Sequence, residues 1–275
     1  MAAPLIPALD PIAGKLRRKQ LELAALEARL AECELELLTF RTALLEFQLR
    51  YEKAVGPLYA ELDRIEAEIA ELRAARNPGD RRAAGRARAA RAKADQSGRA
   101  ADESHQQKNC GKFRPGEELK KLYRELAKRF HPDLAGGERE RIRFEKLMSA
   151  ANAAYAEEDE GRLRQLLEEA GGAAEAVDGP APDGVAAALA RVEQKIARLT
   201  ERLEAIAIEM AELRGSPLNQ LKRQVEEAGS RGLDLIQEMA GFLRREIGRA
   251  LIRKSKVAAG NGEQGSGPSP GCGYG

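Results

Sequence analysis

The sequence predicts an all-α protein in which long coiled-coil helices flank a small helical hairpin, with disordered linkers and a disordered C-terminal tail. Three observations lead to this prediction. Apolar residues alternate at spacings of three and four over two long stretches, and this seven-residue repeat is typical of a coiled-coil seam. Charged residues make up 33% of the chain and aromatic residues only 4%, which is typical of long solvated helices. Prolines and glycines are grouped between the periodic stretches, where they end helices.

The first periodic stretch, residues 12–76, is predicted to be an N-terminal coiled-coil helix. Its apolar positions are Leu23, Leu26, Leu30, Cys33, Leu37, Phe40, Leu44, Phe47, Tyr51, Val55, Leu58, Leu62, Ile65, Ile69 and Leu72. An additional four-residue step near Pro57 is a stutter, and Pro57 is expected to kink or split the helix. Unbroken, the helix would be about 95 Å long, at about 1.5 Å per residue. It needs a partner to bury its seam, either the second periodic stretch in antiparallel orientation or a second copy of the chain.

The second periodic stretch, residues 185–256, is predicted to form a C-terminal coiled-coil region. Its seam runs through Val185, Leu189, Val192, Ile196, Leu199, Leu203, Ile206, Met210 and Leu213. Gly215 to Pro217 interrupt this seam, and Ser216 is a good N-cap for a new helix that begins at Pro217. A last amphipathic helix ends in basic residues, which suit a helix C-terminus. Residues 257–275 are rich in glycine and are predicted to be a disordered tail.

Two segments without apolar periodicity are predicted to be linkers. Residues 77–112 open with a helix-breaking Asn-Pro-Gly sequence and are basic, because they contain Arg81, Arg82, Arg86, Arg88, Arg91, Lys93 and Arg99. We expect this segment to be a flexible, mostly disordered tether. A Lys/Arg cluster can also bind nucleic-acid phosphates, but no aromatic residues are interleaved to stack on bases, so we favour the tether. Residues 171–184, which contain Pro180 and Pro182, form the second linker.

Residues 117–130 form an amphipathic helix with one apolar and one basic face. The apolar positions are Leu119, Leu122, Tyr123, Leu126 and Phe130, at spacings of three and four. The basic positions on the other side are Lys120, Lys121, Arg124 and Lys128. Pro132 ends this helix, because proline lacks an N–H and drives the preceding residue, His131, out of the α region.

A second amphipathic helix is predicted to begin near Arg139. Its apolar face consists of Phe144, Leu147, Met148, Ala151 and Tyr155. Two helices with matching apolar faces and a short connection fold back as an antiparallel pair. We therefore expect His131, Pro132 and Asp133 to be held at the exposed tip of this hairpin. The basic face of the preceding helix would steer the hairpin towards an acidic partner surface.

These residues resemble the J-domain of DnaJ-type co-chaperones. The resemblance is carried by the run LYRELAKRFHPD from Leu122 to Asp133, and by Phe144, Leu147, Ala151-Asn152 and Ala154-Tyr155 after it. It covers residues 113–170, a minor part of the 275-residue chain. The resemblance implies that the module docks on a DnaK-type chaperone and stimulates its ATP hydrolysis. It also implies the contact residues: His131, Pro132 and Asp133 would signal to the partner, and Lys120, Lys121, Arg124 and Lys128 would form the docking surface.

One part of the J-domain pattern is missing from this sequence. The domains of that family open with a short helix, but residues 102–114 carry no apolar stripe. Another element must then cover the helix pair, and Leu163, Leu166 and Leu167 form a short amphipathic stretch that could do so. If this stretch does not cover the pair, the module would be a degenerate, inactive relative. The chain would then be a structural coiled-coil scaffold.

Several kinds of site are not supported by the sequence. It contains no nucleophile–base set, phosphate-binding loop or metal-ligand spacing, so we expect no enzymatic activity, cofactor or metal. Cys33, Cys110 and Cys272 are scattered, which does not indicate a disulfide framework. The N-terminus lacks the pattern of a signal peptide, and no apolar run approaches the roughly 20 residues that span a bilayer. We therefore expect a cytoplasmic co-chaperone with a DnaK-type partner, in which the coiled coil could also pair two chains.

Overall fold

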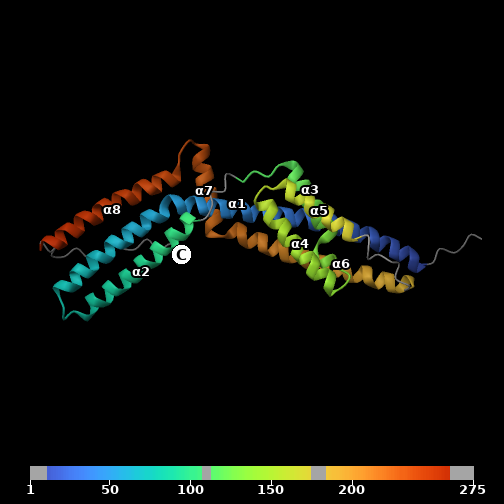
Figure 1. Ribbon diagram of the computed structural model, residues 1–275, viewed down its shortest axis with the longest axis horizontal. Helices are drawn as coiled ribbons and strands as arrows, with labels where there is room; N and C mark the ends of the chain where they lie inside the picture. The colour runs from blue at the N-terminus through green and yellow to red at the C-terminus, as the bar shows by residue number, and fades with distance from the viewer. Residues whose placement is uncertain (1–10, 107–112, 175–183, 261–275) are drawn as a thin grey trace, which may run out of the picture. The chain divides into compact units, whose positions relative to one another are not determined.

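The computed structural model describes residues 11–106, 113–174 and 184–260, and every regular element in these ranges is helical (Figure 1). The elements are α1 (Pro11–Arg76), α2 (Arg81–Gln106), α3 (Glu117–Phe130), η1 (Pro132–Leu134), α4 (Glu138–Ala156), α5 (Glu160–Ala174), α6 (Val185–Gly215), α7 (Pro217–Ser230) and α8 (Leu235–Ala259). No strand occurs in the three ranges, so the predicted all-α class is confirmed. Most of the predicted second linker and of the predicted tail lies outside the described residues.

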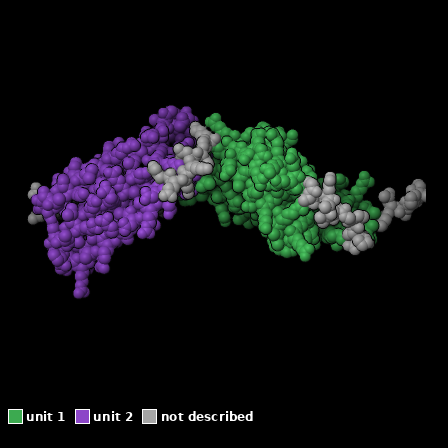
Figure 2. Space-filling model, in the orientation of Figure 1, with its two compact units in different colours: residues 1–46, 110–220 green, residues 47–109, 221–275 purple. Residues whose placement is uncertain are grey.

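The chain divides into two compact units, residues 1–46 with 110–220 and residues 47–109 with 221–275 (Figure 2). Helix α1 contributes its first part to unit 1 and the rest to unit 2. It is continuous from Pro11 to Arg76, so the expectation that Pro57 could split it is wrong. Apolar residues on both sides of the proline, Val55 and Ile65, are almost fully buried, and this packing holds the chain in the helix.

The main core of unit 1 lies where α3, α4 and α5 pack against one another and against α1. Its larger buried residues are Leu35, Leu119, Leu122, Tyr123, Leu126, Phe130, Phe144, Met148, Tyr155, Leu163 and Leu166. Leu163 and Leu166 of α5 therefore cover the helix pair, as the sequence predicted. Ala31 and Leu35 of α1 contribute to the same core, a contact that the spacing of apolar residues did not predict. Helices α1 and α5 together therefore cover the α3–α4 pair, in place of the opening helix that a J-domain would have.

The first part of α1 also packs against α6. Leu30 and Leu37 are buried together with Leu199, Ile206 and Met210 of α6. Two ion pairs join the helices, Glu34 with Arg202 and Arg41 with Glu209. The two pairs are seven residues apart on each helix, so α1 and α6 run parallel rather than antiparallel. This spacing fits the seven-residue repeat that the sequence shows in both segments.

In unit 2, the second part of α1 packs against α8. Ile65 and Ile69 are buried with Ile247 and Ala250 of α8, and a neighbouring cluster contains Val55, Ala240 and Leu243. Two ion pairs lie beside these clusters, Glu66 with Arg253 and Glu68 with Lys254. The seam that the sequence predicted for α1 is therefore covered by helices of the same chain in both units.

Helix α2 corrects the prediction that residues 77–112 form a disordered tether. The helix begins after Asp80, whose Oδ1 accepts hydrogen bonds from the N–H groups of Arg82 and Ala83 at 2.8 and 3.0 Å. This is N-capping, and alanine is the strongest helix former. Two of the basic side chains pair with α1: Arg91 binds Glu71 at 2.7 Å and Lys93 binds Asp63 at 2.8 Å. Buried alanines, Ala83, Ala87 and Ala94, complete the contact.

The predicted cap of α7 can also be compared with the structure. Ser216 caps the next helix, because its Oγ accepts a hydrogen bond from the N–H of Asn219 at 3.2 Å, as predicted. None of the described helices has the length and apolar character that crossing a membrane requires. Among the described residues, no three His, Cys, Asp or Glu side chains are placed to hold a metal ion together.

Candidate functional site

The candidate site is the corner between α3 and α4, residues 131–135. His131 has φ −69° and ψ 138°, the extended backbone expected before a proline. Pro132 to Leu134 then form the single 3₁₀ turn η1. His131 caps this turn, because its Nδ1 accepts a hydrogen bond from the N–H of Asp133 at 3.2 Å. The tripeptide therefore has one defined conformation that its own side chain helps to fix.

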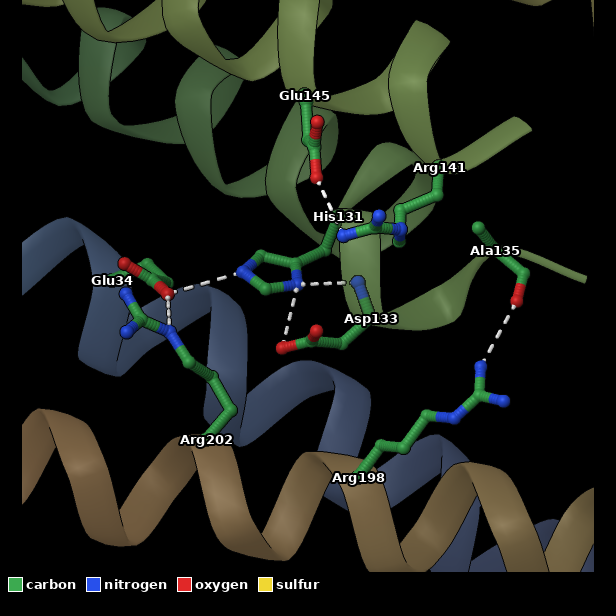
Figure 3. Close-up of polar contacts among 8 residues, drawn as sticks. All are labelled: Glu34, His131, Asp133, Ala135, Arg141, Glu145, Arg198 and Arg202. Atoms are coloured by element: carbon green, nitrogen blue, oxygen red, sulfur yellow. Dashed lines mark hydrogen bonds and ion pairs between the residues drawn. The ribbon is translucent and has the colours of Figure 1, made fainter. Parts of the chain in front are cut away.

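His131 is buried, with only 6% of its surface exposed, so the prediction of an exposed histidine at the tip is wrong. Its Nε2 lies 3.0 Å from Oε1 of Glu34 on α1 (Figure 3). Since Nδ1 accepts the hydrogen bond of Asp133, its lone pair is occupied and the ring proton belongs to Nε2. His131 therefore donates that proton to Glu34. Both ring nitrogens of His131 therefore already form hydrogen bonds within the chain, Nε2 with Glu34 and Nδ1 with Asp133.

Glu34 is shared between the corner and α6. The same oxygen, Oε1, accepts a second hydrogen bond from Nε of Arg202 at 2.7 Å. Burial acts to raise the pKa of Glu34, but the hydrogen bonds from His131 and Arg202 outweigh it and the pKa is lowered. Burial likewise opposes the charge of Arg202, whereas Glu34 raises the pKa of this guanidinium overall. The arrangement holds an ionised carboxylate between a histidine and an arginine.

The corner also makes apolar and backbone contacts with α6. Leu134 is buried in the cluster that contains Leu30 of α1 and Leu199 of α6. Arg198, one helical turn before Arg202, donates a hydrogen bond from Nη1 to the carbonyl oxygen of Ala135 at 3.4 Å (Figure 3). Helix α6 therefore acts on both ends of the corner. Arg202 reaches His131 only through Glu34, whereas Leu199 and Arg198 contact Leu134 and Ala135 directly.

Asp133 is more accessible than His131. Its side chain is 33% exposed, and Oδ2 lies 3.5 Å from Nδ1 of His131. With Pro132 it lines a cavity of about 310 Å³, whose other walls include Arg141 and Arg198. The carboxylate thus remains within reach of an external group, although two guanidinium groups lie around the same cavity. The predicted exposure of the tripeptide holds in part for Asp133 and not for His131.

The four basic residues of the predicted docking surface have different surroundings. Lys120 is hydrogen-bonded to Glu117 at 2.8 Å, and this bond raises the pKa of Lys120. Arg124 lies 3.5 Å from Glu32 of α1. Lys121 and Lys128 are exposed, the side chain of Lys121 by 71%, although Lys121 also lies 3.9 Å from Glu118. The stripe therefore contains two cations that are half-buried beside acidic residues and two that face outward, one of them in a long, exposed ion pair.

Sequence reasoning missed the residues that hold the corner: Glu34, Arg198 and Arg202. Glu34 is 97 positions from His131 and 168 positions from Arg202, so no local motif joins them. One weak signal existed for Glu34, because it lies between the seam residues Cys33 and Leu37 of a helix that needed a partner.

No family model, curated protein or solved structure matches the chain. The J-domain resemblance therefore depends on the residues of 113–170 alone.

Proposed function

We propose that the chain is a J-domain-like co-chaperone, which recruits a DnaK-type chaperone through the corner and stimulates its ATP hydrolysis. The observation that best supports this function is the corner itself. His131-Pro132-Asp133 connects a basic helix, α3, to a second amphipathic helix, α4, through a single turn. Helix periodicity does not explain this tripeptide, and its combination with the two flanking helices is what resembles the J-domain family.

In this mechanism Asp133 and the exposed cations make the first contact with the chaperone. The partly exposed carboxylate of Asp133 can form a charge-assisted hydrogen bond with an arginine or lysine of the partner. Lys121 and Lys128 are seven residues apart on α3 and would steer the module towards an acidic surface. The chain performs no chemistry itself, since it acts by binding the partner and changing the partner's own ATPase cycle. The long helices would serve assembly or client binding.

Steady-state ATP turnover of a purified DnaK-type chaperone, measured with increasing amounts of the full-length chain, tests the proposal. We expect wild type to raise turnover. Asp133→Asn should need at least about tenfold more protein for the same effect, since a hydrogen bond to a charged group contributes about 1.5–3 kcal/mol. Glu168→Gln, which changes an exposed carboxylate on α5, is the matched control and should equal wild type. If neither wild type nor a variant that frees His131 raises turnover, the proposal is wrong.

A structural scaffold is the second candidate function, and the burial of His131 favours it. In a scaffold the corner would serve only as a packing unit that Glu34 and Arg202 tie to the long helices. This function predicts that Asp133→Asn leaves the turnover of any DnaK-type chaperone unchanged. It also predicts that no substitution that frees His131 produces stimulation. The two candidates are therefore separated by the same assay.

A further inference from the structure

We propose that α6 is an inhibitory cover over the corner, and that it withholds His131 from a chaperone until α6 moves away. The inference rests on the proposed function, because a cover regulates the corner only if the corner has a partner. We call Arg198, Leu199 and Arg202 the α6 cover. All three lie within two turns of α6, and each makes or supports a contact with residues 131–135.

The polar part of the cover acts on His131 through Glu34. Arg202 donates to Oε1 of Glu34 at 2.7 Å, and His131 donates to the same oxygen at 3.0 Å (Figure 3). The guanidinium group thereby keeps the carboxylate ionised and oriented towards the imidazole. Glu34 is itself only 9% exposed, so water does not compete freely for this oxygen. While the contact lasts, His131 cannot donate its proton to a partner.

The apolar part of the cover seals the other end of the corner. Leu199 is fully buried and shares a cluster with Leu134, the residue that follows the tripeptide. Arg198 donates to the carbonyl oxygen of Ala135 at 3.4 Å. The cover therefore contacts the side chain of Leu134 and the carbonyl group of Ala135 directly, and it reaches His131 through Glu34.

The packing of unit 1 allows α6 to leave without unfolding the J-like module. The main core of the module is built from α1, α3, α4 and α5, and the residues of this core include none from α6. The contacts of α6 belong to a separate cluster that it shares with α1 and Leu134. Separation of the Glu34–Arg202 pair would return both charges towards water, and the solvation that they regain would offset much of the Coulombic attraction that is lost. Removal of α6 would therefore uncover Leu134 and the carbonyl group of Ala135 and leave the helices of the module packed. His131 would then keep only its hydrogen bond to Glu34 of α1, whose carboxylate Arg202 would no longer hold in place.

The first experiment measures the accessibility of His131 in the full-length chain. The chain contains only two histidines, so mass spectrometry can assign modification by diethyl pyrocarbonate to His131 or His105. We expect Arg202→Ala to increase the reaction rate of His131 by about tenfold, because one hydrogen bond to a charged group is lost from the closed state. Arg214→Ala changes an exposed arginine of the same helix and is the matched control, with no expected change. Arg198→Ala is a second variant that weakens the cover without touching Glu34.

The second experiment measures turnover of a purified DnaK-type chaperone with the same variants, after circular dichroism has shown that their helicity equals that of wild type. We expect Arg202→Ala to stimulate turnover at about tenfold lower concentration than wild type, in parallel with the accessibility of His131. Adding His131→Gln to Arg202→Ala should abolish the gain.

The outcomes distinguish the cover from the proposed function. If wild type stimulates turnover and neither α6 variant differs from Arg214→Ala in either assay, the cover is refuted and the function stands. A wild-type His131 that reacts as fast as a free histidine also refutes the cover. If the α6 variants expose His131 but no form of the chain stimulates turnover, the proposed function is wrong and so is the regulatory role of α6.

Discussion

At the scale of single residues, the corner depends on the charge of Glu34. A buried carboxylate is costly unless strong hydrogen bonds compensate its desolvation. Glu34 has two such bonds, from His131 and Arg202, and the net result is a lowered pKa. A carboxyl group whose pKa is lower in the folded state binds fewer protons there than when unfolded, so its contribution stabilises the fold above its ordinary pKa of 4.5 and disappears as the pH falls through the folded value.

Glu34→Gln should therefore destabilise the chain at pH 7 by about 1–3 kcal/mol, because the ionised acceptor of two hydrogen bonds is lost. The difference from wild type should shrink as the pH falls below 4.5, where the unfolded chain binds a proton at Glu34, and it should vanish once the pH has passed the lowered pKa of the folded carboxyl group. Urea unfolding at several pH values measures both effects. Glu36→Gln, an exposed position on α1, should change the free energy of unfolding by less than about 0.5 kcal/mol. A difference for Glu34→Gln that is the same at pH 7 and below pH 4.5 would contradict the ionised network.

At the scale of secondary-structure elements, α2 has the composition of a disordered segment and is nevertheless a helix. Its first N–H groups are satisfied by Asp80, and its buried alanines allow close packing on α1. Arg91 and Lys93 find acidic partners on α1 at Glu71 and Asp63. Arg86 also lies 3.8 Å from Asp80, so the hypothesis that this segment binds nucleic acid through all of its basic residues must allow for three that already have acidic partners.

Asp80→Ala should weaken α2 by about 1 kcal/mol, because the N-cap hydrogen bonds to Arg82 and Ala83 are lost. Amide hydrogen exchange in the peptide that contains residues 81–106 should accelerate, and exchange in α3 should not change. Asp102→Ala provides the control, since it removes an exposed aspartate from the same helix. Equal acceleration by both substitutions would mean that capping by Asp80 does not hold the first turn.

Apolar spacing and the positions of proline and glycine predicted most of the helices. They did not predict the contacts between segments that are far apart in the sequence. Apolar spacing located α3 and its partner α4, and the leucines of α5 were correctly expected to cover the pair. The same spacing could not reveal that α1 joins this core, because the stripe of α1 fits several partners equally well. Composition misjudged α2, since its acidic partners come from an earlier helix. The burial of His131 required Glu34 and Arg202 to meet from separate parts of the chain.

At the scale of the whole molecule, α1 supplies the apolar surface on which other helices pack. Within unit 1 its seam residues Leu30 and Leu37 are covered by α6, and within unit 2 Ile65 and Ile69 are covered by α8. The sequence left open whether a second chain would cover this seam. Because partners from the same chain occupy it in both units, a single copy can bury the seam throughout the described part of α1.

This arrangement predicts stability that does not depend on protein concentration. Leu30→Glu places a charge at a fully buried position and should cost at least about 3 kcal/mol, whereas Leu45→Glu, at a position that is 55% exposed, should cost less than about 0.5 kcal/mol. The urea midpoints of wild type and both variants should stay constant over a hundredfold range of protein concentration, since folding and assembly are linked only when a second chain buries the seam. A midpoint that rises with concentration would instead show that a second chain stabilises the fold, and the prediction that one copy buries the seam of α1 by itself would then be wrong.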